Sequence, residues 1–299
     1  MAAATAAVKH AHAGPEDRIR DAGIQVGLFL AVLAGLWALW EGFKWFGETT
    51  ELTLGTFQVN DRTFPHLHDI VQTLFEPSRR NGPLLIDILV DAALFTAKEA
   101  FVGFLIGATV GFTIAVILAH SALLQRGFMP YVVASQTIPI LAVAPMVVVW
   151  VNPKLPEGFR DWGAVSLIAA FLTFFPVTIN TLRGLKSADP RALELMRSYA
   201  SSTWSVLWKV RVPASMPYLF AALKVSATAS VVGAIIGELP ASIQDGLGGA
   251  ILNFNQYYAS APTRLWATNL IAAALGIAFF LAVVGVEKLV VRRAPEHIA

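Results

Sequence analysis

Residues 183–213 are the polar segment of this chain with the clearest chemical potential, because acidic, basic and aromatic side chains alternate there at defined spacing. Glu194 is followed six residues later by Ala200, and Pro213 closes the segment. Catalytic patterns are missing. The chain has no cysteine, no P-loop of the form G-x-x-x-x-G-K-[ST], no Ser-centred nucleophile elbow and no His/Asp/Glu cluster with metal-ligand spacing. The pattern therefore favours a binding segment over an enzyme, and we expect no metal site.

The composition indicates a membrane protein. Hydrophobic residues make up 56% and charged residues 14% of the chain, against roughly 25% charged residues in soluble domains. The mean hydropathy is +0.62. The net charge of +2 gives no indication of nucleic-acid binding. The predicted class is an all-α polytopic membrane protein.

Six segments are long and apolar enough to cross a bilayer, since a span needs about 20 such residues. The third contains Pro130, Pro139 and Pro145, and the fifth is interrupted by Lys224. The predicted spans are 24–46, the region that runs uncharged over 101–119, 128–151, 162–182, 214–237 and 265–286.

The distribution of Lys and Arg predicts the orientation. With the N-terminus inside, thirteen basic residues fall in cytoplasmic segments and six in outer ones, which favours cytoplasmic N- and C-termini. We expect a disordered tail over 1–23, in which His10 and His12 are inert, a transmembrane domain over 24–291 and a cytoplasmic tail over 292–299. A retained anchor is favoured over a cleaved signal peptide, because the first apolar run is long and no small-x-small site follows it.

Two predicted outer segments are more than turns. Residues 47–86 contain apolar residues at helical spacing from Leu67 to Phe75, followed by proline and glycine stops, which predicts a short interfacial helix. Residues 239–262 contain a turn signal at 245–249 and then the sequence ILNFNQYY.

The segment 183–213 reads as two short helices on the cytoplasmic side. Asp189 is placed to cap the first helix and Pro190 to occupy its first position. Ser201 and Ser202 interrupt that helix and provide a cap for a second one, which we expect Pro213 to end. Helices this short are marginal in water. Their apolar stripe, which includes Leu193, Met196 and Tyr199, needs either a partner groove or the lipid surface, and physical reasoning alone leaves both open.

Ionisable residues inside predicted spans are functional candidates because their burial is costly. Lys98 and Glu99 are sequence neighbours, so they point about 100° apart on a helix and each should meet a different element. Lys224 is expected to extend to the cytoplasmic interface. Glu238 either faces the entrance of a pathway or caps the outer helix.

A translocation pathway would use backbone freed by proline and nearby polar groups. Pro139 and Pro145 either expose carbonyl groups to a cavity or only kink the span for packing. Tyr257 also suits an interfacial aromatic belt. The candidate pathway residues are Gln136, Thr137, Pro139, Glu238, Asn253 and Asn255, with Gln256 and Tyr257 beside them.

The order Glu194, Ala200, Val210, Val212, Pro213 resembles the EAA loop of ABC-importer permeases, whose pattern is Glu-Ala-Ala, three residues, Gly, nine residues and Ile-x-Leu-Pro. SQTIPILAVAPMVVVW and VPASMPYLFAALKVSATASVVGAIIGEL are similar to the nitrate, sulfonate and taurine branch. The resemblance covers about 60–291 and implies a type I ABC-importer permease fold. It assigns ATPase coupling to Asp189, Pro190, Arg191, Leu193, Glu194, Met196, Arg197, Tyr199, Ala200 and Pro213.

Two departures from that pattern have physical consequences. Leu195 and Met196 replace the two alanines of the motif, and both remain apolar. Ala200 replaces its glycine. If the turn requires a positive φ, Ala200 carries strain on the order of 1 kcal/mol.

The resemblance implies a non-catalytic subunit in a bacterial inner membrane that moves a small solute by alternating access. The solute would be nitrate, a sulfonate or taurine, or alternatively a pyrimidine thiamine precursor or riboflavin. The implied partners are a cytoplasmic ABC ATPase, which holds ATP and Mg²⁺, an outer substrate-binding protein, a second copy of the chain and membrane lipid. No cofactor is expected on this chain. A secondary transporter would need repeats and a buried ion site, and no repeat is detected. A membrane scaffold would not require this loop register.

Overall fold

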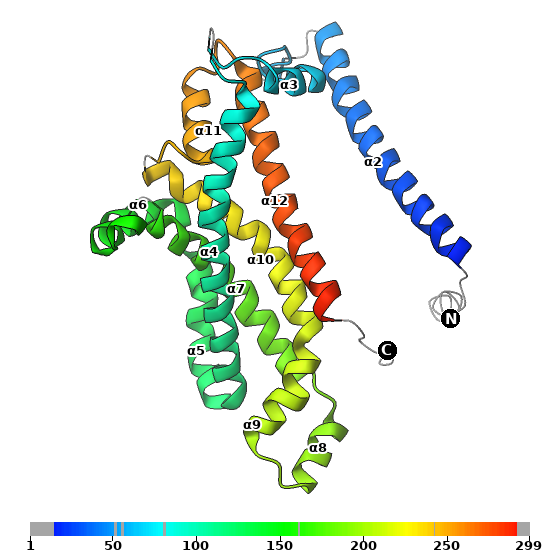
Figure 1. Ribbon diagram of the computed structural model, residues 1–299, viewed down its shortest axis with the longest axis vertical. Helices are drawn as coiled ribbons and strands as arrows, with labels where there is room; N and C mark the ends of the chain where they lie inside the picture. The colour runs from blue at the N-terminus through cyan, green and yellow to red at the C-terminus, as the bar shows by residue number, and fades with distance from the viewer. Residues whose placement is uncertain are drawn as a thin grey trace. The chain divides into compact units, whose positions relative to one another are not determined.

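The computed structural model describes residues 15–50, 53–54, 57–79, 82–160, 162–241 and 243–291. The chain divides into two compact units, Met1–Gln72 and Thr73–Ala299. The first unit holds α2 (Pro15–Thr49), β1 (Thr53–Leu54), β2 (Phe57–Gln58) and most of α3 (Leu67–Leu74). The second holds α4 (Leu85–His120), α5 (Ala122–Ala134), η1 (Ser135–Thr137), α6 (Ile140–Val151), η2 (Asn152–Lys154), η3 (Glu157–Phe159), α7 (Gly163–Lys186), α8 (Pro190–Ser198), α9 (Thr203–Val206), the π-helical turn η4 (Leu207–Arg211), α10 (Val212–Ala241), α11 (Leu247–Gln256) and α12 (Pro262–Val290), as Figure 1 traces by colour.

The first predicted span, 24–46, lies wholly within α2, a helix of 35 residues. At 1.5 Å per residue this helix is about 50 Å long, which exceeds the hydrocarbon core. Disorder was predicted over residues 1–23, but residues 15–23 are helical. The helix begins at Pro15, in a polar stretch before the apolar run, and hydropathy alone does not predict a helix there. Residues 1–14, with His10 and His12, and the predicted tail 292–299 lie outside the described residues.

The chain after α2 folds back onto that helix within the first unit. The ring of Phe64 lies 4.9 Å from that of Trp40 and 5.5 Å from that of Phe43, measured between centroids. The indole N–H of Trp40 donates to the carbonyl of Pro65 at 3.2 Å. The predicted interfacial helix is α3, which ends at Leu74, one residue earlier than the apolar pattern suggested.

Lys44 provides a second link between α2 and the returning chain. Its side chain is fully buried, and its ammonium lies 2.5 Å from Oδ1 of Asp61 and 3.6 Å from Oε1 of Glu48. The hydrogen bond from Lys44 holds the pKa of Asp61 below its ordinary value. The side chain of Asp61 remains 78% exposed, so this pair contributes little to stability.

Four helical segments among the described residues are long and apolar enough to cross a membrane. They are α4, α7, α12 and the continuous segment Thr203–Ala241 that contains α10. The second, fourth, fifth and sixth predicted spans lie within them, so these four predictions are confirmed as apolar helices of spanning length.

The third predicted span, 128–151, is sharply bent at one of its prolines. The structure has two helical segments there, 122–137 and 140–154, which meet at an angle of 97°. Pro139 lacks an amide proton and has its φ fixed near −68°, and Ile138 before it is extended at φ −75°, ψ 121°. A residue that precedes proline avoids the α region, so the helix ends before Pro139 and a new one starts after it.

A stripe of glycines lets α4 pack closely against α7. Gly103, Gly107 and Gly111 recur every four residues, which places them on one face of α4. A Cβ built on Gly107 would lie 2.5 Å from the carbonyl oxygen of Ala170, and one on Gly111 would lie 2.6 Å from that of Phe174. Small residues at this spacing allow helix backbones to approach in a membrane. The sequence analysis missed this stripe.

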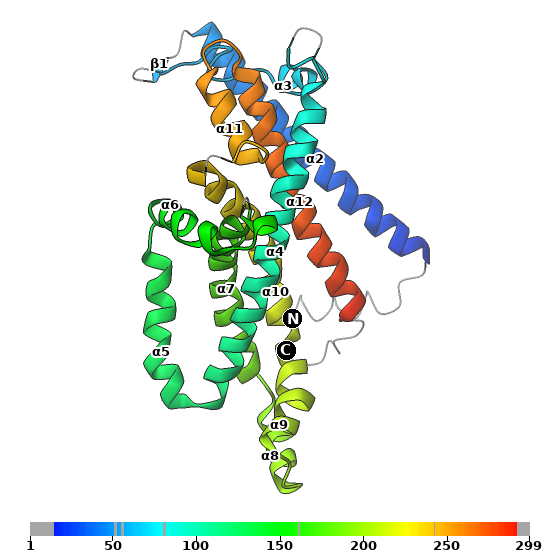
Figure 2. The same cartoon turned by 60° about the vertical axis from the view of Figure 1, so that its left-hand side comes forward.

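Helix α7 also packs against α10, so it lies between two neighbours in the centre of the second unit (Figure 2). The hydroxyl of Ser226 donates to the carbonyl of Thr173 at 3.2 Å across the α7–α10 contact. Helix α10 is linked to α12 by an ion pair of 2.9 Å between Lys224 and Glu287. These contacts join α4, α7, α10 and α12 into a helical frame, which holds the polar elements at its two ends.

Candidate functional site

Helix α8 begins with the cap that the sequence predicted. The carboxylate of Asp189 accepts a hydrogen bond of 2.9 Å from the backbone N–H of Arg191, and Pro190 occupies the first helical position. Proline is suited to that position because its missing N–H would have no partner there. Helix α8 therefore starts from interactions within three residues of sequence.

Helix α8 ends in a left-handed turn at Ala200, whose φ is +47°, the one positive φ outside glycine among the described residues. The N–H of Ser201 donates to the carbonyl of Met196 at 3.0 Å, and that of Ala200 donates to Arg197 at 2.9 Å. This pair of hydrogen bonds is the Schellman arrangement, in which glycine normally takes the left-handed position. The condition set by the sequence, a positive φ at this turn, is met, so the departure from glycine costs strain.

The second short helix is also capped locally. The hydroxyl of Ser202 accepts from the N–H of Ser205 at 3.2 Å. The expectation that Pro213 ends this helix is wrong, because residues 203–241 are helical without a break. The wider π-helical turn at Leu207–Arg211 precedes Pro213 directly. Such a turn changes the hydrogen-bond register where proline lacks a donor and its ring crowds the preceding turn.

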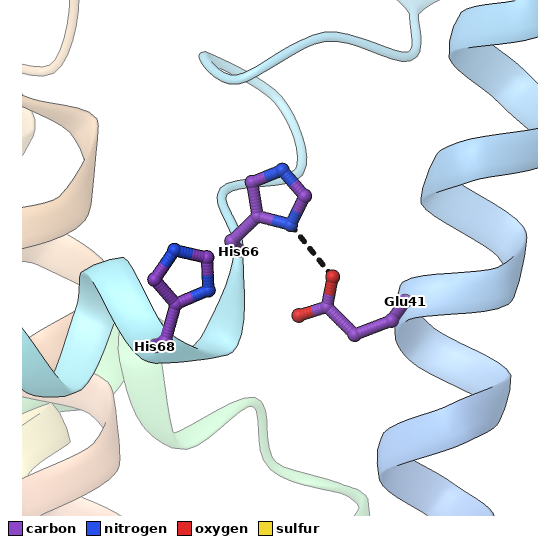
Figure 3. Close-up of side chains that lie close together, drawn as sticks. All are labelled: Glu41, His66 and His68. Atoms are coloured by element: carbon purple, nitrogen blue, oxygen red, sulfur yellow. Dashed lines mark hydrogen bonds and ion pairs between the residues drawn. The ribbon is translucent and has the colours of Figure 1, made fainter.

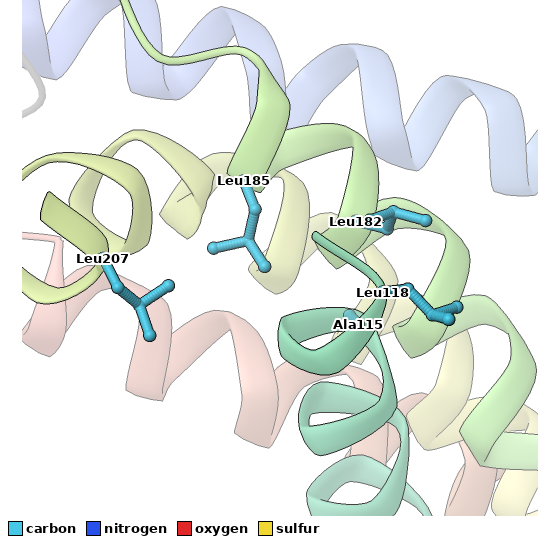
Figure 4. Close-up of a cluster of buried hydrophobic side chains, with 5 residues drawn as sticks. All are labelled: Ala115, Leu118, Leu182, Leu185 and Leu207. Carbon is cyan, nitrogen blue, oxygen red and sulfur yellow. The ribbon is translucent and has the colours of Figure 1, made fainter. Parts of the chain in front are cut away.

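The base of this hairpin, residues 187–213, is attached to the helical frame by a buried apolar cluster. Figure 4 shows Ala115 and Leu118 of α4, Leu182 and Leu185 of α7, and Leu207 of the π-helical turn. The guanidinium of Arg211 also donates to the carbonyl of Ala119, at the end of α4, at 3.3 Å. The base of the hairpin thus contacts α4 and α7 and is continuous with α10.

The rest of the hairpin extends beyond the ends of α4 and α7 in both views (Figure 1, Figure 2). Neither α8 nor α9 has a buried residue. Tyr199 is 75% exposed and Leu195 57% exposed, and they lie four residues apart on one face of α8. The second helix and its extension add the exposed Trp204 and Trp208, whose rings meet edge to face at 5.5 Å.

The opposite face of α8 lines a cavity of about 240 Å³ within the hairpin. Leu193 and Arg197 line it from α8, Leu207 and Arg211 from the π-helical turn, and His120 from the end of α4. Glu194 and Arg191 are exposed and do not line it. The residues predicted to couple to an ATPase therefore divide into an inward group and an outward group, a division that their spacing alone did not show.

The predicted pathway residues lie in three places in the second unit. Gln136, Thr137 and Pro139 are exposed at the break between α5 and α6. Asn253 lines a cavity of about 610 Å³ between α4 and α11, while Asn255, which is also exposed, does not line it. That lining includes Asp91, Asp245, Gln256 and Tyr257, and no lysine or arginine among the described residues belongs to it.

A second cavity, of about 540 Å³, lies beside the first and shares Ile88, Asn253, Phe254 and Tyr257 with it. Its charged lining residues are Arg79 and Arg264. The two cavities therefore carry opposite charge on either side of the residues they share. Asn253 and Tyr257 line both cavities. The sequence alone did not show that they lie near Arg79 and Arg264.

Glu238 is fully buried and caps α11 from another helix. Its Oε2 accepts from the N–H of Gly248 at 2.5 Å, and its Oε1 accepts from the hydroxyl of Thr96 at 2.6 Å. Thr96 in turn accepts from the N–H of Leu247 at 2.9 Å. This network satisfies two of the free amides at the start of α11 and joins α4, α10 and α11. The alternative that Glu238 caps the outer helix is confirmed, and its role in a pathway stays a prediction.

Lys98 and Glu99 meet different elements, as their spacing predicted. The ammonium of Lys98 lies 4.1 Å from the ring centroid of Trp162, in a cation–π contact. Glu99 is fully buried, and its carboxyl group interacts with that of Glu238 on α10. Thr96, which completes the Glu238 network, carried no signal in the sequence because its partners are 142 and 151 positions away.

Comparison with known proteins identifies the family. Residues 107–294, more than half of the chain, match the binding-protein-dependent transport system inner membrane component. The chain belongs to this family. A solved structure described as an amino acid ABC transporter with histidines aligns with a TM-score of 0.51 over 70% of this chain and 95% of that one. At 17% sequence identity this similarity concerns the fold alone. It agrees with the type I permease fold expected from the sequence.

Two curated relatives are transport permeases. The formylaminopyrimidine transport permease protein ThiX of Halalkalibacterium halodurans is 31% identical over 49% of this chain and 56% of its own length. The putative aliphatic sulfonates transport permease protein SsuC of Bacillus subtilis is 29% identical over 60% of this chain and 61% of its own length. The chain thus matches less than two thirds of either protein. Family and apolar helices together identify a multi-pass membrane protein of ABC transport systems.

Proposed function

We propose that this chain is the membrane-spanning permease subunit of an ABC importer and that the α8–α9 hairpin docks on a separate ATPase. The observation that carries the proposal is the outward face of the hairpin. Leu195, Tyr199 and Trp204 are exposed there on helices that are capped at their own ends and attached at their base to the helical frame. An apolar helix face of this kind suits a groove on a partner protein.

The same anchoring supports transport by alternating access. The hairpin is continuous with α10 through the π-helical turn and is held to α4 by the Arg211–Ala119 hydrogen bond. Movement of a docked ATPase would therefore move α4, α7 and α10 together. In this proposal the chain is non-catalytic, binds no cofactor for hydrolysis, and works as a homodimer in a bacterial inner membrane with both termini cytoplasmic. ATP and Mg²⁺ belong to the ATPase, and an outer binding protein delivers the solute.

For the substrate we propose a small solute with an anionic group, such as nitrate, a sulfonate or taurine. Arg79 and Arg264 line one of the two adjoining cavities and support recognition of an anion. Asp91 and Asp245 line the other and would suit an amino group such as that of taurine. The alternative is a pyrimidine thiamine precursor, supported by the similarity to ThiX, or riboflavin. Uptake of labelled taurine in competition with nitrate and formylaminopyrimidine distinguishes these substrates.

Docking is tested by charge reversal on the hairpin. Glu194→Arg should abolish co-purification of the permease with its ATPase and stop ATP-dependent uptake in proteoliposomes. Glu157→Arg, a reversal at an exposed glutamate outside the hairpin, is the matched control and should leave both unchanged. Uptake that persists without any ATPase would instead support a secondary transporter. Normal ATPase binding by Glu194→Arg and by Leu195→Asp would refute the docking surface.

A further inference from the structure

Three potential metal ligands converge in the first unit, far from the hairpin in sequence. Glu41 lies on α2, and His66 and His68 lie at the start of α3, with the ligand atoms of all three within 4.8 Å of one another. Figure 3 shows Glu41 directed at the two imidazoles. Nδ1 of His66 is 2.6 Å from Oε2 of Glu41, and the two histidine rings are 5.1 Å apart. The fold therefore completes a cluster of which the sequence shows only the pair His-x-His.

Two further contacts hold the cluster in place. The other carboxylate oxygen of Glu41 accepts from the N–H of Leu67 at 3.1 Å. Nε2 of His68 lies 3.1 Å from Oδ1 of Asp69, within ion-pair distance. A carboxylate beside one nitrogen of an imidazole is a usual arrangement when the other nitrogen binds a metal. Two ligands are partly buried, since His66 is 34% and Glu41 20% exposed, while His68 is 70% exposed.

The charges near the cluster do not oppose a cation. The one ammonium among the described residues of the first unit, that of Lys44, is engaged by Asp61 and by Glu48, so its charge is balanced within the same unit. Glu48, Asp61 and His66 form a second overlapping group of potential ligands.

We propose that Glu41, His66 and His68 form a binding site for a divalent transition-metal ion of the Zn²⁺ class. Two imidazole nitrogens and one carboxylate oxygen are a Zn²⁺ ligand set and leave a fourth position for water. The same donors suit Mg²⁺ and Ca²⁺ poorly, because those ions take oxygen ligands. Binding would need a small adjustment: the hydrogen-bonded Glu41 and His66 atoms must separate to about 3.3 Å, the spacing of tetrahedral ligands with bonds of about 2.0 Å.

The metal would act as a clamp between α2 and the chain that enters α3. These residues lie outside the family match, which begins at residue 107, so the site is independent of the proposed transport function. It would fix the N-terminal helix to the segment 60–68, which otherwise contacts it through the rings of Trp40, Phe43 and Phe64. A bound ion would therefore raise the stability of this unit by binding only its folded form.

The test uses the full-length chain, purified without a polyhistidine tag, in detergent. Titration with Zn²⁺ should show saturable binding of one ion and raise the melting temperature, whereas Mg²⁺ and Ca²⁺ should do neither. Co²⁺ should give the visible absorption of a four-coordinate site. His68→Ala should weaken Zn²⁺ binding by about tenfold or more. It should melt like the parent chain without metal, because the side chain is mostly exposed.

Two controls separate this site from other histidines. His120→Ala removes an exposed histidine of the second unit and should leave Zn²⁺ binding unchanged. A chain with both His10 and His12 replaced by alanine should also bind normally. Loss of binding in that double variant, or equal Zn²⁺ affinity in the parent, His68→Ala and Glu41→Gln, would overturn the proposal. Because Glu41→Gln keeps the shape of the side chain, it tests the carboxylate charge without opening a cavity.

Discussion

The two helix junctions of the second unit satisfy their backbone groups in opposite ways. Between α10 and α11, the caps of α11 come from Glu238 on the preceding helix and Thr96 on α4, and both are fully buried. In the hairpin, the caps come from Asp189 and Ser202, within three residues of the amides they accept. The first junction ties three helices together, whereas the second is complete within its own sequence.

This difference supports the docking role proposed for the hairpin. A junction whose caps come from distant helices must hold those helices in one arrangement, and Gly248 leaves room for the carboxylate because a Cβ there would lie 2.7 Å from Cβ of Glu238. A hairpin that caps itself needs no cover to satisfy its backbone. Its apolar side chains, such as Tyr199 at 75% exposure, are then free to bind a partner.

Of the variants that test the difference between the two junctions, Glu238→Ala should have the largest effect. We expect it to lower the free energy of unfolding by about 3 kcal/mol, because two buried donors lose their acceptor at roughly 1–3 kcal/mol each. Thermal melting in detergent measures the loss. Ser166→Ala is the control and should be tolerated, since the buried hydroxyl of Ser166 has no hydrogen-bond partner among the described residues. Equal losses in both variants would show that the cap is not the cause.

Asp189→Ala removes the corresponding cap in the hairpin and should cost about 1 kcal/mol, the usual value for an N-cap. Because this cap is local, the effect should be confined to α8. Hydrogen exchange of the 190–198 amides should become about fivefold faster while exchange in α4 and α7 stays unchanged. Ser121→Ala, which removes the cap of α5, is the control and should leave α8 unaffected. Faster exchange throughout the unit would contradict a self-contained hairpin.

Ala200→Gly should stabilise the hairpin by about 0.5 kcal/mol. Relief of the left-handed strain, roughly 1–2 kcal/mol, is partly offset by the roughly 0.4–1 kcal/mol of extra chain entropy that glycine has when unfolded. Transport should be retained. Slower exchange of the amide of Ser201, which donates across this turn, is the measurement. A clear loss of protection would show that the turn is not left-handed in solution.

Tyr199→Ala should have the smallest effect on stability, below about 0.5 kcal/mol, because an exposed side chain away from structural features contributes little to folding. It should nevertheless weaken binding of the ATPase. Tyr131→Ala on α5 is the matched control, since Tyr131 is 74% exposed. If both variants bind the ATPase as the parent does, the outward face of α8 is not the contact surface.

The sequence predicted the helical segments and their caps because these depend on neighbours within a few residues. The caps at Asp189 and Ser202 were predicted and are confirmed, and the positive φ on which strain at Ala200 depended is present. The sequence predicted helix ends less well at prolines, because it does not show whether a helix stops at a proline or continues past it. The helices on either side of Pro139 meet at an angle of 97°, yet Pro213 lies in a continuous helix after a π-helical turn.

The amino-acid sequence by itself determined a helical membrane protein with a self-capped polar hairpin, because hydropathy and helix caps depend on residues that are close together in the sequence. Only the tertiary structure decided which distant groups share a site. Thr96 reaches Glu238 across 142 positions, and His66 reaches Glu41 across 25. Such pairs depend on how closely helices pack, and at the glycines of α4 that closeness is set by the absence of side chains.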